Sequence, residues 1–359
     1  MPHQQLISEL ESIVRRDPAK RGLIAPDGEG PGRGELARAA SFFAPDFDIS
    51  GVGLITGFFI PSNRQGDHEN EIAKQHTILE CRNGHAETDG PPGTVVLADV
   101  LANLRIPTSI ITDELCEPVV LAACNAAHLQ AVKVLASPID RQRSAAWRTQ
   151  VLSTTPISQI THFVAIERVG PGYAHPEHAE NQPAPATDQQ NGQPGPSGWQ
   201  PGHCCNMRGE SIDAFSADLH LMIESAKARN PRVNVIGIGD GGNEVGMGRF
   251  PKEELVSRII SPNAHRIPCR IPADATIVAG VSNWGAYALA AAIAVQHDRV
   301  DLLERHSAAA QQQLLERIVS EAGAVDGITR RNEPTVDGLP FLTQIQPWIA
   351  IRKCLGLNP

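Results

Sequence analysis

Short runs of apolar and β-branched residues recur along this chain, separated by polar segments. In residues 233–239 the β-branched side chains alternate with other residues, which is the period of two expected for a buried strand. This run leads directly into a glycine-rich loop. The pattern predicts strands at 52–59, 108–112, 131–135, 161–166, 233–239 and 275–280.

Apolar residues spaced three and four apart predict helices between these strands. The segment 286–295 is almost entirely apolar, so a helix there should be buried on most sides. Alternating strands and helices imply right-handed crossovers, and hence an α/β fold with a mainly parallel sheet and helices on both faces. The predicted helices are 4–15, 94–104, 115–129, 211–228, 252–260, 286–295, 299–321 and 339–355, the last packing back on the sheet.

Two segments interrupt the pattern. Residues 25–34 are rich in glycine and proline and are expected to form a flexible arm. Residues 171–202 combine Pro, Gly, Gln and Asn with few apolar side chains, so burial cannot offset their ordering entropy, and a disordered polar insert is expected. We therefore predict an N-terminal helix and arm at 1–34, followed by one α/β domain at 35–355 that carries the insert.

The composition narrows the class of protein. Hydrophobic residues make up 41% and charged residues 20%, which suits a globular chain, and a net charge of −9 argues against a nucleic-acid partner. No apolar run reaches membrane-spanning length, so no membrane association is expected. Seven cysteines without a C-x-x-C motif fit reduced thiols, and acids near the N-terminus do not resemble a targeting signal. We expect a cytoplasmic enzyme or binding protein for a small molecule, with homo-oligomerisation left open.

Polar residues follow most of the predicted strands. In open α/β sheets, ligands bind beyond the carboxyl ends of the strands. The residues at those ends are Thr56-Gly57, Asp113-Glu114, Glu167-Arg168, Asp240 to Glu244 and Ser282-Asn283, and Glu87 to Asp89 should lie nearby. The sequence thus predicts an acidic cleft at this edge of the sheet.

The glycine-rich loop at 237–248 admits two interpretations. Gly237-x-Gly239-x-x-Gly242 after a strand is a partial match to a dinucleotide-binding loop. That motif also needs an acid at the end of a second strand about 20 residues later, which is missing, and Asp240 and Glu244 would repel a pyrophosphate. The loop more plausibly serves a cation or moves a proton.

Carboxylates gathered at one sheet edge repel one another unless they share protons or a cation. Oxygen ligands suit Mg²⁺ or Mn²⁺ better than Zn²⁺, so we expect a divalent cation there. The alternative is that many of these acids cap helices or pair with arginines. Asp89, ahead of a predicted helix, is open to both interpretations.

Several blocks of the chain resemble the D-glutamate cyclase family, specifically its C-terminal domain. They are GIGDGGNEVGMG and ADATIVAGVSNWGAYALA, with ETDGPPG at 87–93, IER at 166–168 and NMRG at 206–209 in the same order. The resemblance spans residues 35 to 355. It implies cyclisation of D-glutamate to 5-oxo-D-proline with loss of water, and an α/β fold with an acidic cavity for a divalent cation.

This chemistry requires the α-ammonium to lose a proton, the γ-carboxylate to become electrophilic, and water to leave with acid assistance. We expect Asp240, Glu244 and Asn243 to be catalytic, with Asp240 or Glu244 as the base. The expected metal ligands are Asp89, Glu167, Asp240 and Glu244. The expected substrate-binding residues are Arg208, Arg168, Asn283, Ser282, Gly241 and Gly242.

Two other functions fit the same residues. A cation in an acidic cleft also serves a metal-dependent hydrolase or lyase acting on another small acid or a phosphorylated substrate. A non-catalytic sensor that binds an amino acid is the second alternative, with the polar insert as a docking segment. Turnover of a candidate substrate would exclude the sensor.

Overall fold

Alternate side chains of the central strands enter two separate cores, as a period of two requires. Leu54, Val164 and Ile236 face one core, whereas Ile55, Phe163 and Val235 face the other. Because both faces of the sheet are covered, its strands are buried throughout, apart from the edge strand and the first residues of two others. The computed structural model describes residues 3–62, 84–154, 157–173 and 202–359.

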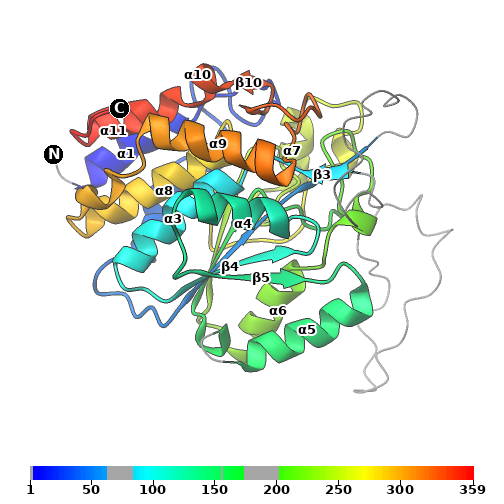
Figure 1. Ribbon diagram of the computed structural model, residues 1–359. Helices are drawn as coiled ribbons and strands as arrows, with labels where there is room; N and C mark the ends of the chain where they lie inside the picture. The colour runs from blue at the N-terminus through cyan, green and yellow to red at the C-terminus, as the bar shows by residue number, and fades with distance from the viewer. Residues whose placement is uncertain (1–2, 63–83, 155–156, 174–201) are drawn as a thin grey trace.

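The central sheet has six strands in the order β5-β4-β1-β6-β7-β8, and every pairing is parallel (Figure 1). Two small antiparallel pairs, β2 with β3 and β9 with β10, lie outside it. The predicted α/β class is therefore confirmed. The strands are β1 (Val52–Thr56), β2 (Phe59–Pro61), β3 (Gly84–Ala86), β4 (Thr108–Asp113), β5 (Lys133–Ser137), β6 (His162–Ile166), β7 (Asn234–Gly239), β8 (Ala275–Val278), β9 (Thr335–Val336) and β10 (Leu339–Pro340).

Helices cover the sheet unequally (Figure 1). Helices α5 (Arg141–Ser153) and α6 (His220–Arg229) lie on one face, and α7 (Lys252–Arg258) contributes Leu255 to the same core. The opposite face carries a thicker helical layer, in which α3 and α8 pack against each other and α9 lies over α4. Its members are α1 (His3–Val14), α2 (Glu35–Ser41), α3 (Pro91–Asn103), α4 (Glu117–Ala126), α8 (Ser282–Gln296), α9 (Ala308–Ala322), α10 (Phe341–Gln344) and α11 (Gln346–Cys354).

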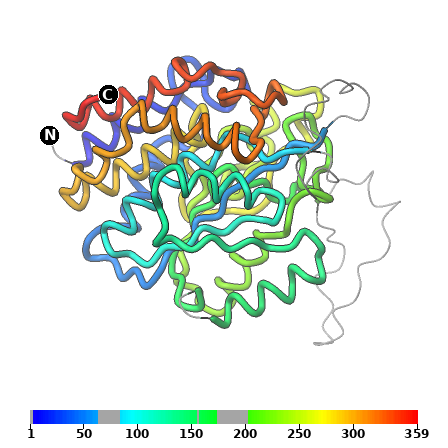
Figure 2. The backbone as a smooth tube through the Cα atoms, in the orientation of Figure 1, coloured from blue at the N-terminus to red at the C-terminus, as the bar shows by residue number. Residues whose placement is uncertain are grey.

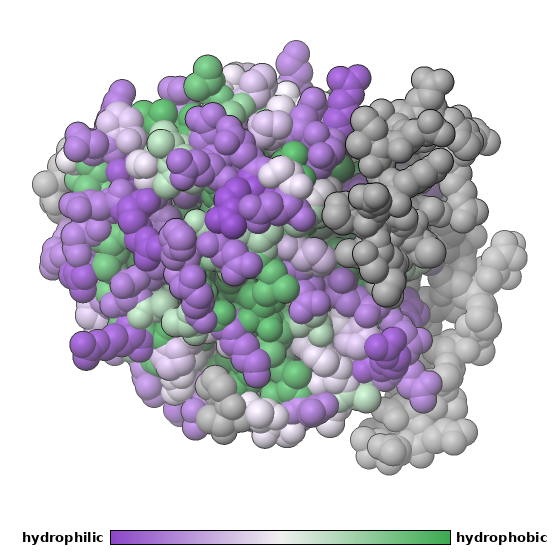
Figure 3. Space-filling model, viewed as in Figure 1, coloured by the Kyte–Doolittle hydropathy of each residue, from purple (hydrophilic) through white to green (hydrophobic). Residues whose placement is uncertain are grey.

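The termini lie near each other on this thicker side, because α1 packs on α11 and both pack on α8 (Figure 2). At the sheet edge, β5 begins with exposed Lys133 and continues with partly exposed Val134 and Leu135. In the space-filling view, apolar residues are visible near the middle of the face that is turned to the viewer (Figure 3). None of the helices in the described ranges is long and apolar enough to cross a membrane.

The strand order places a topological switch beside β1. The chain adds β4 and β5 on one side of β1, then crosses to add β6, β7 and β8 on the other. Connections on the two sides of such a point diverge and leave a crevice at the carboxyl ends of the strands. The loops after β6, β7 and β8 all open toward this crevice.

The segment 25–34, expected to be a flexible arm, is instead held against the fold. Arg15 donates hydrogen bonds to the carbonyl oxygens of Gly28, Gly30 and Pro31, at 2.9, 3.1 and 3.0 Å. Pro31 and the following glycine are buried. Glycine and proline here shape a turn around one guanidinium, which composition alone does not distinguish from mobility.

The helix predicted at 211–228 is wrong in its first half, because α6 begins only at His220. Ile212 donates its backbone N–H to Cys204, and Phe215 stacks on Phe59 with ring centroids 5.4 Å apart. Met222, by contrast, enters the core beneath the sheet. Ile212 and Phe215 thus pack in a different place from Met222, although their spacing in the sequence is that of one helical face.

Three other predicted elements are each divided in the structure. The strand at 52–59 breaks at Gly57, which has a φ of 108°, into β1 and β2. The helix at 299–321 separates into a short 3₁₀ turn and α9, which starts at an N-cap formed by Ser307. The helix at 339–355 becomes β10, α10 and α11, and α11 packs on α1 and α8 rather than on the sheet.

The insert predicted at 171–202 lies largely outside the described residues. Its two described ends are buried or half-buried and pair with each other, since the N–H of Gly172 bonds to the carbonyl of His203 at 3.0 Å. The two described ends of the segment thus lie side by side.

Arg168 ties the centre of the sheet to its surroundings. Its guanidinium donates to Asp113 at 2.6 Å, to the carbonyl oxygens of Gly57 and Ala217 at 2.8 and 2.6 Å, and to Ser216 at 2.9 Å. Arg168 and Asp113 are almost completely buried. The pair joins the ends of β4 and β6 across β1.

Asp113→Asn should destabilise the protein strongly, because it leaves the buried Arg168 guanidinium without its counter-charge. We expect a loss of about 3–5 kcal/mol, measured by urea unfolding. Asp301→Asn removes the partner of Arg299 in a fully exposed pair and should change little. Equal effects of the two substitutions would contradict this account of Arg168.

Candidate functional site

Six buried carboxylates converge at the crevice, and none is more than 5% exposed. They come from four parts of the chain: the segment between β3 and α3, the ends of β6 and β7, and the turn between β9 and β10. The predicted acidic site therefore exists as a cluster of side chains. Its members are Glu87, Asp89, Glu167, Asp240, Glu244 and Asp337.

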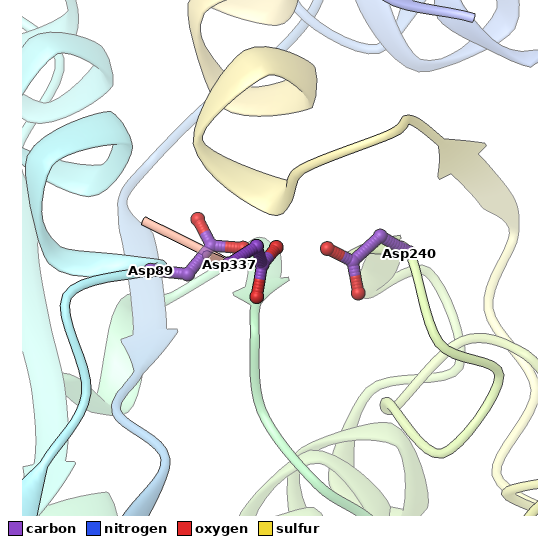
Figure 4. Close-up of side chains that lie close together, drawn as sticks. All are labelled: Asp89, Asp240 and Asp337. Carbon is purple, nitrogen blue, oxygen red and sulfur yellow. The ribbon is translucent and has the colours of Figure 1, made fainter. Parts of the chain in front are cut away.

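Asp240 lies at the centre of this cluster. One oxygen each from Asp89, Asp240 and Asp337 lie within 4.8 Å of one another, and the same holds for Glu167, Asp240 and Glu244. Figure 4 shows the first three carboxylates close together near the start of a helix. A single ion could contact either set, and Asp240 belongs to both.

Asp89 and Asn283 fix two helices by capping each other's element. The carboxylate of Asp89 accepts the N–H groups of Ser282 and Asn283, each at 2.8 Å, at the start of α8. The side-chain oxygen of Asn283 in turn accepts the N–H groups of Gly90 and Gly93 at 3.1 and 2.8 Å, at the start of α3. Asp89 therefore caps α8, which is distant in the sequence, rather than α3, which follows it directly. It also belongs to the carboxylate cluster.

Glu244 folds back over the glycine loop that carries it. Its two oxygens accept the N–H groups of Asp240, Gly241 and Gly242 at 2.9, 2.6 and 2.7 Å. A Cβ atom on Gly239 would lie 2.6 Å from the Glu244 carboxyl carbon, so this position excludes larger residues. The glycines make room for a side chain of the same loop and donate to it.

Two cluster acids have backbone conformations that favour glycine. Glu167 has a φ of 44° and Asp337 a φ of 53°. For a residue with a Cβ atom this region costs about 1–3 kcal/mol, and such residues concentrate at functional sites. Ser282 holds the Glu167 side chain by donating its hydroxyl to Oε2 at 2.6 Å.

Arg21 brings a positive charge into the cluster. It lies in the segment between α1 and α2, and its guanidinium bonds to Asp240 with one nitrogen and to Asp337 with the other. Its side chain is only 13% exposed. One guanidinium among six carboxylates leaves a large negative surplus.

That surplus favours protonated acids. Burial, reinforced by the charges of Glu167, Asp337 and Asp89, raises the pKa of Glu87 well above its ordinary value. Burial and the charges of Glu244 and Asp89 do the same to the pKa of Glu167.

Asp89 and Glu244 are affected in the same direction but are opposed by backbone donors. Burial and the charge of Asp337 raise the pKa of Asp89 to about 7, against the N–H groups that favour its ionised form. Burial also raises the pKa of Glu244, although amides of its loop stabilise its carboxylate. The site can therefore hold and release protons near neutral pH.

Three carboxylate oxygens in the cluster have no hydrogen-bond partner among the described residues. They are Oε1 of Glu87, Oδ2 of Asp240 and Oδ2 of Asp337. An unpaired buried acceptor is costly, so each calls for a proton or a cation. Oxygen atoms alone are the ligand set that hard divalent cations prefer, and the cluster fits such an ion.

A cavity of about 220 Å³ adjoins the carboxylates. Glu87, Glu167 and Asn243 line its acidic side, and Arg208 lines its mouth. The Asn243 side chain is held by a bond from Nδ2 to the carbonyl of Cys205 at 2.9 Å. Lys20, Arg21 and Arg330 also line the cavity. Apolar side chains, among them Phe58, Ile60, Ile260 and Ile328, form another part of its wall.

The structure separates the residues expected to bind substrate. Arg208 lines the cavity, but Arg168 is committed to Asp113 and does not. Ser282 and Asn283 use their side chains to position Glu167 and α3, and the N–H groups of the loop glycines 241 and 242 are occupied by Glu244. In this geometry these residues position the site rather than face the cavity.

Sequence reasoning missed Arg21 and Asp337 and left Glu87 outside the expected ligands. Glu87 stands two positions before Asp89 in the ETDGPPG block, so the sequence could have indicated it as a further ligand. Asp337 precedes a glycine in a tight turn, where Asp usually serves the turn itself. Nothing around Arg21 in the sequence marks it, because its partners lie 219 and 316 residues away.

A family model described as "D-glutamate cyclase-like, C-terminal" matches residues 10–181 and 193–348. The chain is also similar to human "D-glutamate cyclase, mitochondrial", with 29% identity over 294 residues. That alignment covers 80% of this chain but 39% of the human protein, so the chain spans about two fifths of its relative's length. The match to the family model extends over most of the chain and includes the segments that carry all six carboxylates. The chain belongs to the D-glutamate cyclase-like family, as represented by its C-terminal domain.

Proposed function

We propose that this chain is a D-glutamate cyclase-like enzyme that converts D-glutamate into 5-oxo-D-proline and water. The observation that carries the proposal is a cavity with two glutamates of raised pKa on one side and an arginine at its mouth. The family and the name of the human relative supply the substrate.

The reaction needs both forms of a carboxyl group. The nitrogen of D-glutamate attacks the carbon of its own γ-carboxyl group (Cδ), so a C–N bond forms, a C–O bond breaks and water leaves. The ammonium must first give up a proton to an ionised carboxylate, and the departing oxygen must receive protons. A cluster in which several acids compete for few positive charges supplies protonated and ionised groups side by side.

Glu87 and Glu167 are the acids in position to exchange protons with a molecule in the cavity, because both line it. A raised pKa favours the protonated form of either one, and that form can give its proton to the leaving oxygen. Its ionised neighbour can accept the ammonium proton. Asp240 and Glu244, expected from the sequence to be the base, do not line the cavity. The charge of Glu244 contributes to the raised pKa of Glu167.

Substrate recognition falls to the cationic side of the cavity. D-Glutamate carries two carboxylates and one ammonium, so it needs a positive partner. Arg208 is exposed at the mouth, with its backbone N–H fixed to Asn206 at 2.9 Å. The apolar part of the wall suits the two methylene groups of the substrate.

A divalent cation, Mn²⁺ or Mg²⁺, is part of the proposal. Asp240 would hold it together with Asp89 and Asp337, or with Glu167 and Glu244. When bound, such a cation supplies positive charge that polarises a carboxylate and offsets the negative surplus.

Turnover should be specific for one enantiomer. Ring closure needs the nitrogen held about 3–3.5 Å from the carbon of the γ-carboxyl group, and an anion site and an acid at fixed positions achieve this for one enantiomer only. Incubation of each enantiomer with the protein and MnCl₂, followed by chiral chromatography with mass detection, should give 5-oxo-D-proline from D-glutamate and far less product from L-glutamate. Binding of D-glutamate without product would favour the sensor instead.

Arg208→Ala should raise KM and lower kcat together. Its charge would serve the substrate carboxylate in both the ground state and the transition state. Steady-state kinetics on D-glutamate should show both effects, with kcat/KM lower by about 10²-fold or more. Arg317→Ala, on the exposed surface of α9, is the matched control and should leave both constants unchanged. An unchanged KM in Arg208→Ala would remove Arg208 from substrate binding.

Stability without metal should fall as pH rises. The pKa of Asp89 is about 7 in the folded protein and near 4 when unfolded, so folding favours its protonated form. That stabilisation is present below pH 4 and is lost as the pH rises toward 7. Mn²⁺ should oppose the loss, and its effect should grow with pH because it binds ionised carboxylates.

Thermal unfolding between pH 5 and 8, with and without MnCl₂, measures this effect. Asp240→Asn should lose most of the response to Mn²⁺, because Asp240 belongs to both sets of carboxylates. Asp46→Asn, an exposed acid outside the cluster, should respond like wild type. A normal response in Asp240→Asn would place any metal elsewhere.

A further inference from the structure

Arg21 and Arg168 both pair with buried carboxylates, but their surroundings differ. Arg168 also bonds to two backbone carbonyls and a serine, is 1% exposed and does not line the cavity. The guanidinium bonds of Arg21 go to Asp240 and Asp337, and its side chain lines the cavity wall. The hydrogen bonds of Arg168 hold its guanidinium in place, whereas the Arg21 side chain can move into the adjoining cavity.

The Arg21 guanidinium contacts two of the three carboxylates in the first set, Asp240 and Asp337. It takes Oδ1 of both Asp240 and Asp337, and their Oδ2 atoms have no partner among the described residues. Both side chains are at least nine-tenths buried. One oxygen from each, with one from Asp89, lie within 4.8 Å of one another. A guanidinium and a divalent cation on the same pair of carboxylates would repel each other strongly, because like charges would lie close together in a buried site.

We propose that Arg21 is an exchangeable counter-ion, and that its guanidinium and a divalent cation occupy the space between Asp240 and Asp337 in turn. The inference rests on the cation proposed above. Each occupant contacts the same two carboxylates, but the guanidinium offsets one negative charge whereas the divalent cation offsets two. The cation can also contact the Oδ2 atoms that the guanidinium leaves without a partner.

The backbone beneath Arg21 need not move during this exchange. Asp17 accepts the N–H groups of Arg21 and Gly22 at 2.9 and 2.7 Å, which anchors the turn. Only the side chain would swing, and the space open to it is the cavity that Arg208 also lines. The released guanidinium would then face a carboxylate of a small acid, so metal binding would prepare the substrate site.

Direct Mn²⁺ binding, followed by the electron paramagnetic resonance of the free ion, tests the competition. Arg21→Met keeps much of the length but removes the charge, so Mn²⁺ should bind about tenfold more tightly or better, as expected when a competing state is removed. Arg21→Lys keeps one charge without the two-pronged geometry and should be intermediate. Arg208→Met, which removes a charge from the same cavity but not from the carboxylate pair, should bind Mn²⁺ like wild type.

A second measurement uses the wild-type protein and does not depend on the folding of a variant. Phenylglyoxal modifies accessible arginines, and peptide mass spectrometry reports the extent at each one. Mn²⁺ should increase labelling of Arg21, because displacement exposes its guanidinium. The exposed Arg208 serves as the internal reference.

The outcomes separate this inference from the proposed function. Tighter binding in Arg21→Met together with increased labelling supports exchange. Equal or weaker binding in Arg21→Met, or unchanged labelling under saturating Mn²⁺, overturns exchange and leaves the proposed cation intact. If neither wild type nor Arg21→Met binds Mn²⁺, the cation and the exchange both fail, while turnover of D-glutamate remains a separate result.

Discussion

An excess of buried negative charge governs this structure. Six carboxylates with little access to water must be compensated from within, and isolated ionised groups in such surroundings are not stable. Backbone N–H groups provide much of this compensation. They are dipoles that stabilise a carboxylate without adding a charged side chain to the site. The start of α8 serves Asp89, and the loop after β7 serves Glu244. The negative charge that these dipoles do not compensate is the basis of the proposed chemistry.

The same compensation explains the architecture around the cluster. Asp89 and Asn283 each cap the helix of the other, so α3 and α8 start beside the crevice and pack closely along their length. Gly93 permits this approach, because a Cβ there would lie 2.7 Å from the Cβ of Ala286. A polar contact at the site and an apolar contact in the core thus depend on each other.

Much of the fold could be predicted from local pattern. Buried parallel strands are short and apolar, and their order of strand and helix restricts the topology to few choices. The failures came where two patterns overlapped: Phe215 and Met222 have helical spacing but enter different cores. The anchored turn at 25–34 could not be predicted, because the residue that holds it, Arg15, is a single side chain with no periodic signal.

The site was predictable as far as it is local. Asp89, Glu167, Asp240 and Glu244 stand at strand ends or before a helix, and the structure gathers all four. The role of each site residue was harder to predict than its position in the fold. Ser282 and Asn283 have the chemistry of substrate ligands, yet their partners are other parts of the chain. Sequence shows which groups a residue offers, but not whether another residue has already used them.

The pair formed by Arg21 and Asp337 has a kinetic consequence. The two residues are separated by 316 positions, while the six parallel strands lie between them in the sequence. Contacts at such separation form late, because closing a long loop is entropically costly. We therefore expect the sheet to assemble with its acids protonated and the guanidinium to arrive last. In that order of events, protons would balance the charge of the cluster until Arg21 arrives.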